Sequence, residues 1–292
     1  MATVKPFKAI RPDAKYADKV ISLPYDVMNR KEAAEMAADN PYSFLHICRA
    51  EIDLPEQENA YDQSVYEKAR DNIAERLASG VFVQEDKPAL YIYRQIMDGR
   101  VQTGIVGCVA VDEYQNNTIK KHEFTRVEKE KDRINHFDVC DADTEPVFLT
   151  YRDDKRIRTI MEGYVANHEP EYDITSDDGI QHTLWVVDDP ELVRSLTDLF
   201  DEIPALYIAD GHHRSASACK VGLKRREEHP DYTGDEEFET IIDENIYEEA
   251  VAVKSARRWN QAVEESEGIR QIRDRIRCGQ CGAPMLRHIN SK

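Results

Sequence analysis

The dipeptide Asp98-Gly99 places the strongest constraint on the fold. It lies between two β-rich runs, residues 89–97 and 100–111. Asp-Gly favours the tight turn that joins antiparallel strands, so the two runs are expected to pair as a hairpin. A hairpin interrupts any regular alternation of strands and helices. The sequence therefore predicts an α+β fold, a mixed sheet with flanking helices, rather than a doubly wound one.

Local patterns predict further elements on both sides of this hairpin. Apolar residues at every fourth position predict a helix over residues 61–79, which Gly80 ends. A strand followed by a helix is also expected around residues 206–218. The remaining predicted elements are helices over 30–38 and 155–166, a helix that opens at Asp189-Pro190, and short strands at 20–23 and 184–187.

The charge and cysteine content narrow the class of protein. The formal net charge is −18, which repels nucleic-acid phosphates and disfavours broad duplex binding. The six cysteines show no disulfide framework, which is typical of reduced thiols in the cytosol. With neither a secretory signal nor an apolar run long enough to span a membrane, a cytoplasmic enzyme without a membrane partner is expected.

The character of the chain changes near residue 237. Residues 1–236 carry the predicted strands and helices, and we interpret them as the catalytic region. Residues 237–292 have no strand-like apolar run and many isolated charges, which predicts a disordered or helical tail. Cys278 and Cys281 in this tail form a CxxC, which is either half of a metal site or inert.

The turn Asp210-Gly211-His212-His213-Arg214 is the first candidate site. An apolar strand delivers the chain to Asp210, and a helix is expected from Ser215. Gly211 allows a backbone conformation that residues with a Cβ rarely adopt. Because the start of a helix attracts anions, the turn predicts a phosphate site in which Asp210 holds a metal or takes a proton. The alternative is that Asp210 only caps the helix and both histidines are solvated.

The second candidate site follows the hairpin, over residues 120–133. Glu123 lies beside a histidine and a lysine, so it is the natural candidate for a general base. Lys131 and Arg133 are expected to grip phosphate oxygens. The alternative is a solvated charged helix stabilised by i,i+4 ion pairs. A third stretch, residues 40–46, places His46 in a strand-like run, where a core role is the favoured interpretation.

Three stretches together resemble a family of uncharacterised bacterial and archaeal proteins in the ParB/sulfiredoxin-like group. They are Leu23 to Val27, Lys121 to Arg133, and Ala209 to Arg214, and residues 40–46 agree as well. The last turn also resembles that of free L-serine kinases. The resemblance covers roughly residues 4–235, and the segment after residue 237 looks atypical for the family.

The resemblance implies a ParB/sulfiredoxin-like core and a kinase that transfers a phosphoryl group from a nucleotide, ATP or ADP with Mg²⁺, to free serine or a similar hydroxyl compound. The alternative is a nucleotide-binding regulatory module without turnover. The implied partners are a small substrate and a nucleotide, with no nucleic acid. The implied residues are Glu123 and Asp210 for catalysis, Gly211, His212, His213, Arg214, Lys131 and Arg133 for the nucleotide, and His122, Thr125 and Asp26 for the substrate.

Overall fold

The computed structural model describes residues 1–55 and 61–229. The chain divides into two units, Met1–Tyr232 and Thr233–Lys292, and the described residues all belong to the first. The predicted tail, with Cys278 and Cys281, lies outside the described residues. The described unit is α+β, with several small sheets and flanking helices. Within it, no helix is both long and apolar enough to cross a lipid bilayer.

The predicted hairpin forms one side of a four-stranded antiparallel sheet with the order β5-β4-β10-β9, in which β5 is an edge strand. Asp98 and Gly99 both have a positive φ, as a tight hairpin turn requires. The hairpin prediction is confirmed, although β5 ends before residue 111. After Val106 the pairing changes, and Cys108–Val109 pair with Val4–Lys5 instead of with β4. Gly107 between them lies so close to Val4 and Leu90 that a Cβ there would be 2.8 Å and 2.9 Å from their side chains. The strands are β4 Leu90–Met97, β5 Arg100–Val106, β9 Tyr172–Thr175 and β10 Gln181–Val187.

A second, three-stranded sheet has the order β7-β11-β8 and is the mixed one. Its central strand, β11, pairs parallel with β7 and antiparallel with β8. Two further pairs, β1 with β6 and β2 with β3, are antiparallel. The strands are β7 Ile119–Lys120, β8 Phe148–Thr150, β11 Leu206–Asp210, β1 Val4–Lys5, β6 Cys108–Val109, β2 Ile10–Pro12 and β3 Phe82–Gln84.

Four of the longer helices begin at a residue whose side chain caps them. Asn29, Asp62, Asp154 and Asp189 each accept a hydrogen bond from a backbone N–H in the first turn of α2, α4, α7 and α8. These four predicted helices are therefore confirmed. The helices are α1 Ala17–Val20, α2 Arg30–Ala37, α3 Leu45–Cys48, α4 Gln63–Ala78, α5 Val111–Gln115, α6 Val127–Cys140, α7 Lys155–Asn167, α8 Pro190–Asp201 and α9 His212–Glu228, with short 3₁₀ turns at η1 Tyr25–Val27 and η2 Ala50–Asp53.

Three local predictions were wrong. Residues 20–23 form no strand, because Val20 ends α1 and is buried against α4. The strand-like run around His46 is the short helix α3. Both ring nitrogens of His46 lie near acceptors, 2.7 Å from Asp53 Oδ1 and 3.2 Å from the Asn40 carbonyl, so its role is structural. Helix α9 starts at His212 rather than at Ser215, which puts both histidines of the predicted turn in its first turn.

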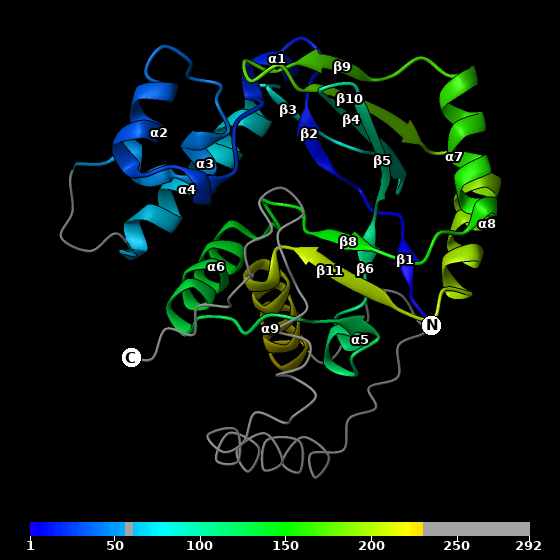
Figure 1. Ribbon diagram of the computed structural model, residues 1–292. Coiled ribbons are helices and arrows are strands. Elements are labelled where there is room, and N and C mark those ends of the chain that lie inside the picture. Colours follow the sequence, from blue (N-terminus) through cyan, green and yellow to red (C-terminus); the bar gives the residue numbers. More distant parts are fainter. Residues whose placement is uncertain (56–60, 230–292) are drawn as a thin grey trace, which may run out of the picture. The chain divides into compact units, whose positions relative to one another are not determined.

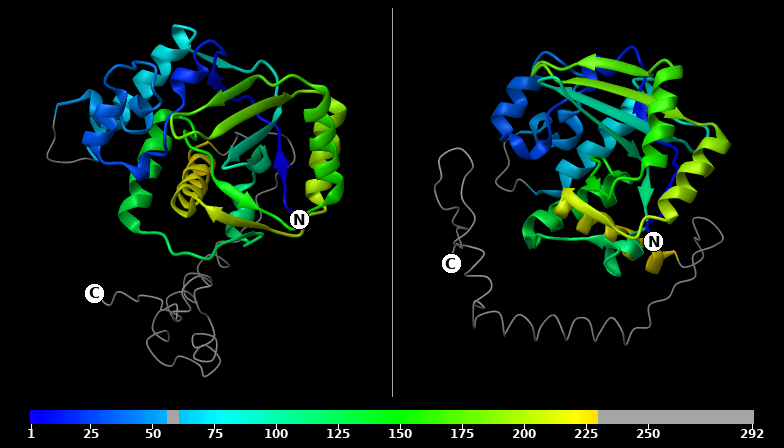
Figure 2. Two further views of the ribbon diagram at one scale, coloured as in Figure 1. Left: turned by 45° about the horizontal axis from the view of Figure 1, so that its top comes forward. Right: turned by 45° about the vertical axis from the view of Figure 1, so that its right-hand side comes forward.

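The two largest of three hydrophobic clusters contain most of the buried apolar residues of the described unit. One joins β4, β10 and β11 to α7 and α8, with Ile92, Trp185 and Leu196 among its buried members. The other surrounds α4, where Val65, Ala69 and Ile73 are buried as the periodicity predicted. Figure 1 shows α2, α3 and α4 grouped on one side and α7 and α8 paired on the opposite side, and both views in Figure 2 agree. Helices α6 and α9 pack against each other beside the mixed sheet.

Candidate functional site

The junction between β11 and α9 depends on Gly211. Its φ of +91° lies in the region that favours glycine. A Cβ at this position would also lie 3.0 Å from the Val147 side chain. No side chain caps the start of α9. The N–H groups of its first turn therefore stay available to an anion.

Arg214 fastens this junction to neighbouring segments. Its Nη2 donates to Asp210 Oδ2 at 2.6 Å, and its Nη1 donates to the Pro146 carbonyl. The Arg214 side chain is 14% exposed, whereas that of Asp210 is 71% exposed. The Asp210 carboxylate thus faces solvent at the start of α9, and the Arg214 guanidinium that pairs with it is largely buried.

His212, in the turn at residues 210–214, contacts His122 and Glu123 of the second predicted site. Its buried ring packs edge-to-face against His122, with ring centroids 4.4 Å apart. Its Nδ1 lies 3.8 Å from Glu123 Oε2, and its Nε2 has no hydrogen-bond partner. Burial and the neighbouring His122 lower the pKa of His212, so the ring is neutral at pH 7. Its contact with Glu123 is therefore not an ion pair at that pH.

The loop that carries Glu123 is fastened to α9. The backbone N–H of Arg126 donates to His213 Nε2 at 3.0 Å, which requires a neutral ring. Burial, together with Lys129 and Arg126, lowers the pKa of His213 and favours that state. The geometry assigns the ring proton to Nδ1. His213 therefore positions the loop from one nitrogen and keeps a donor on the other.

Glu130, which the sequence did not single out, anchors the same loop. Thr125 Oγ1 donates to Glu130 Oε2 at 2.6 Å, and Lys220 pairs with the other carboxylate oxygen. Ser217 Oγ on α9 donates to the Glu130 carbonyl at 3.0 Å. Burial opposes the charge of Glu130, yet Lys220 and Thr125 hold its pKa below the usual value. The Thr125 hydroxyl is thus already bonded to α6.

Arg133 lies apart from Lys131 and inside the protein. Its guanidinium is 4.1 Å from the centroid of the Tyr25 ring and binds Asp132. Its Nη1 lies 3.8 Å from Glu145 Oε1. Lys131 is exposed, because side chains two positions apart on a helix point in different directions. Asp26, next to Tyr25, is exposed, and its charge acts on Glu145.

Glu145 is the principal residue that the sequence analysis missed. It follows α6 in the segment Thr144-Glu145-Pro146, which carries no motif of its own. Both of its carboxylate oxygens are buried without a hydrogen-bond partner. Burial raises the pKa of Glu145 to about 7, although Arg133 and Arg214 oppose that change. Only its position before the apolar residues of β8 could have drawn attention to it.

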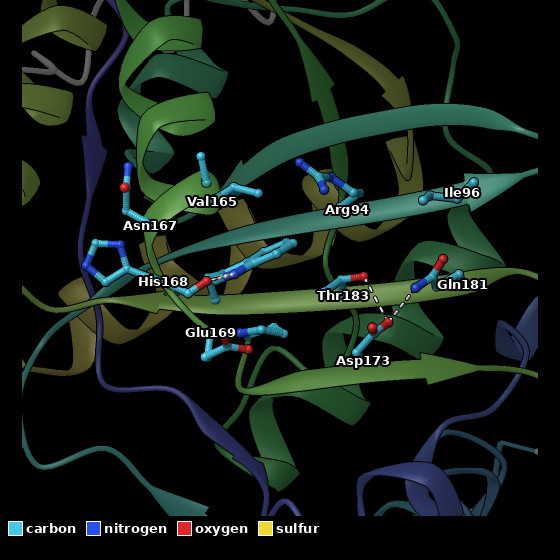
Figure 3. A pocket seen from close by; sticks show the side chains of 12 residues that line it. Arg94, Ile96, Val165, Asn167, His168, Glu169, Asp173, Gln181 and Thr183 are labelled. Carbon is cyan, nitrogen blue, oxygen red and sulfur yellow. Dashed lines mark hydrogen bonds between the residues drawn. The ribbon is translucent and has the colours of Figure 1, made fainter.

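Two cavities in the described unit lie elsewhere. The larger, about 620 Å³, lies between the sheet strands β4, β9 and β10 and the end of α7. Figure 3 shows Asp173 in this cavity accepting hydrogen bonds from Gln181 and Thr183. The smaller, about 310 Å³, is mostly apolar and lies against β2, β4 and β9. None of the predicted site residues lines either cavity.

The residues at the start of α9 fit a phosphate better than a metal held by protein ligands alone. His212 Nε2 and Ser215 Oγ are buried there without a partner. Among residues 1–55 and 61–229, no group of three or more His, Cys, Asp or Glu side chains is placed to hold a metal ion. Magnesium usually needs only one or two carboxylates when phosphate oxygens supply further ligands, and Asp210 meets that condition.

The chain belongs to the DUF1015 family, described as "Protein of unknown function", whose sequence profile matches residues 4–254. The match extends beyond the boundary predicted at residue 236. Neither a curated protein nor a solved structure matches the chain.

Proposed function

We propose that this DUF1015 family member is a small-molecule kinase. It transfers a phosphoryl group from a nucleotide, ATP or ADP with Mg²⁺, to free serine or a similar hydroxyl compound. One observation carries the proposal: Glu123 lies 3.8 Å from His212 in the first turn of α9. Glu123 and the start of α9 are distant in the sequence. The structure therefore brings a carboxylate next to a helix start that suits phosphate.

The start of α9 supplies the donors that phosphates need. Gly211 opens the helix without a side-chain cap, and His213 keeps a ring N–H. Phosphoryl transfer requires positioning and neutralisation of charge more than covalent chemistry by the protein. The exposed Asp210 carboxylate would hold Mg²⁺ beside the phosphates. Bound Mg²⁺ would neutralise charge on the transferred group.

The residues have distinct proposed roles. Asp210 and Glu123 are the catalytic carboxylates, on the phosphate side and the acceptor side. Arg133 and Lys131, with the turn, would contact the nucleotide. His122, Thr125 and Asp26 would shape the substrate site, with Thr125 acting through the loop that Glu130 holds. The motifs shared with the ParB/sulfiredoxin-like group support such a core, which we include in the proposal.

A nucleotide-binding regulatory module without turnover is the second candidate. The ion pair between Asp210 and Arg214 favours it, because this pairing already satisfies one oxygen of the proposed metal ligand. A switch of this kind needs the phosphate site but no carboxylate near an acceptor hydroxyl. The fold alone does not distinguish the two functions.

An assay of the intact chain with ATP, Mg²⁺ and free serine separates these candidates. Phosphorus NMR would detect phosphoserine, and calorimetry in parallel would measure ATP binding. A kinase binds ATP and forms phosphoserine, with turnover reduced in Asp210→Asn. ATP binding without any phosphorylated product would favour the regulatory module. A chain that binds no nucleotide would contradict both.

A further inference from the structure

The carboxylate of Glu145 is unusually placed for a structural residue. Its side chain is 11% exposed, and neither oxygen has a hydrogen-bond partner. Buried polar groups in native proteins are nearly always paired, because an unpaired one costs free energy. A buried carboxylate with two unsatisfied oxygens therefore suggests a ligand that supplies the missing donor.

The nearest charged group is also incompletely paired. Arg133 Nε and Nη2 bind Asp132 Oδ2 at 3.0 Å and 2.8 Å, and the guanidinium stacks on Tyr25. These contacts fix the guanidinium, while Nη1 has no hydrogen-bond partner. Its distance of 3.8 Å from Glu145 Oε1 is too long for a hydrogen bond. The pair thus presents one fixed donor and one acceptor side by side.

Glu145 is also continuous with the start of α9. The next residue, Pro146, accepts a hydrogen bond from Arg214, and Val147 packs against Gly211. The same short segment therefore bears the buried carboxylate and contacts the proposed phosphate site. The charged or titratable groups that act on Glu145 from the surrounding elements are Arg133, Arg214, Asp26, Asp132, Tyr25 and Cys48.

A hydroxyl group matches this arrangement. Its O–H can donate to Glu145 while its oxygen accepts from Arg133. An oxygen about 2.8 Å from each atom fits between atoms separated by 3.8 Å. We propose that the Glu145–Arg133 pair binds the acceptor hydroxyl, so that Arg133 serves the acceptor rather than the nucleotide, and that Glu145, rather than Glu123, takes the proton. This inference rests on the proposed kinase function.

The proton transfer balances the phosphoryl transfer. The hydroxyl oxygen forms a bond to the transferred phosphorus, and the bond from that phosphorus to the leaving oxygen of the nucleotide breaks. The hydroxyl proton passes to Glu145, and the nucleotide leaves one phosphate shorter. A general base works best when its pKa is near the working pH. Burial provides this for Glu145, whose pKa is raised to about 7, whereas Glu123 is 64% exposed.

The test compares three glutamine variants across pH 5 to 9 with ATP, Mg²⁺ and serine. Glu145→Gln should lower kcat by about 10²–10⁴-fold and remove the acid limb of the pH profile near pH 7, while ATP affinity stays within about twofold. Glu123→Gln should keep that limb. Glu113→Gln is the matched control, since Glu113 is also buried but accepts a hydrogen bond from Thr3 away from the site.

The outcomes separate this inference from the function on which it rests. Wild-type turnover in Glu145→Gln, or an acid limb lost only in Glu123→Gln, would overturn the inference and leave the kinase standing. A wild-type chain that phosphorylates no hydroxyl compound would overturn both. Thermal unfolding checks that Glu145→Gln folds. Its melting temperature relative to wild type should be higher at pH 8 than at pH 5, and an unchanged difference would also count against a buried, titrating Glu145.

Discussion

Helices α8 and α9 both follow a sheet strand, yet their first turns are built differently. At α8, Asp189 accepts hydrogen bonds from the N–H groups of Glu191 and Leu192, and Pro190 removes a third donor. At α9, a glycine with positive φ opens the helix and no side chain caps it. At α8 the protein's own side chain satisfies the first N–H groups, so this helix start has a structural role. The uncapped start, surrounded by Glu123, Arg214 and the Glu145–Arg133 pair, can serve a ligand.

The largest expected effect concerns the buried carboxylate beside α9. The pKa of Glu145 is raised from 4.5 to about 7 in the folded chain. The folded state therefore binds the proton more tightly, and this group destabilises the fold as pH rises through that interval. Glu145→Gln should gain stability relative to wild type by about 3 kcal/mol between pH 4 and pH 8.

Denaturant unfolding at several pH values measures this gain. A variant whose stability parallels that of wild type across the interval would show that Glu145 titrates normally. In that case the start of α9 would have no buried proton acceptor beside it. One of the observations that distinguish it from the start of α8 would then be wrong.

The next effect tests why α9 opens with glycine. Gly211→Ala forces a Cβ into a left-handed conformation, at a cost of about 1–2 kcal/mol, and towards Val147 at 3.0 Å. The control is Gly163→Ala inside α7, where a Cβ would meet nothing within 4 Å. That variant should be stabilised by up to about 1 kcal/mol. Equal stability changes at the two positions would remove the argument for a constrained junction.

The smallest effect belongs to the closed start. Asp189→Ala removes the cap of α8 and should cost about 1 kcal/mol of unfolding free energy. Asp189→Asn should retain most of that stability, since asparagine also caps well. Neither change should alter nucleotide affinity, measured by calorimetry. A loss of affinity would mean that the two helix starts are not functionally distinct.

The fold was predictable where a few adjacent residues determine the structure. Asp98-Gly99 predicted the hairpin, and Asn29 and Asp189 predicted the starts of α2 and α8, because capping and turn chemistry are local. The division into separate sheets was not predictable. It depends on contacts between distant segments, such as Val4 against Gly107.

The candidate site was predictable as two motifs but not as one place. The turn at Gly211 and the loop at Glu123 each had a signal in the sequence, and their contact through His212 and His122 did not. Glu145 had none, because its importance comes from burial and from the unpaired Arg133 nearby.

The most direct test of the account is the affinity of the start of α9 for nucleotide. Calorimetric titration of ATP with Mg²⁺ should show one site on the intact wild-type chain. Arg214→Ala, shown to be folded, should bind more weakly by about 1.5–3 kcal/mol, the range for hydrogen bonds to charged groups. Asp189→Ala should bind like wild type. Absence of binding to wild type, or equal affinity in Arg214→Ala, would contradict the assignment of this helix start as the phosphate site.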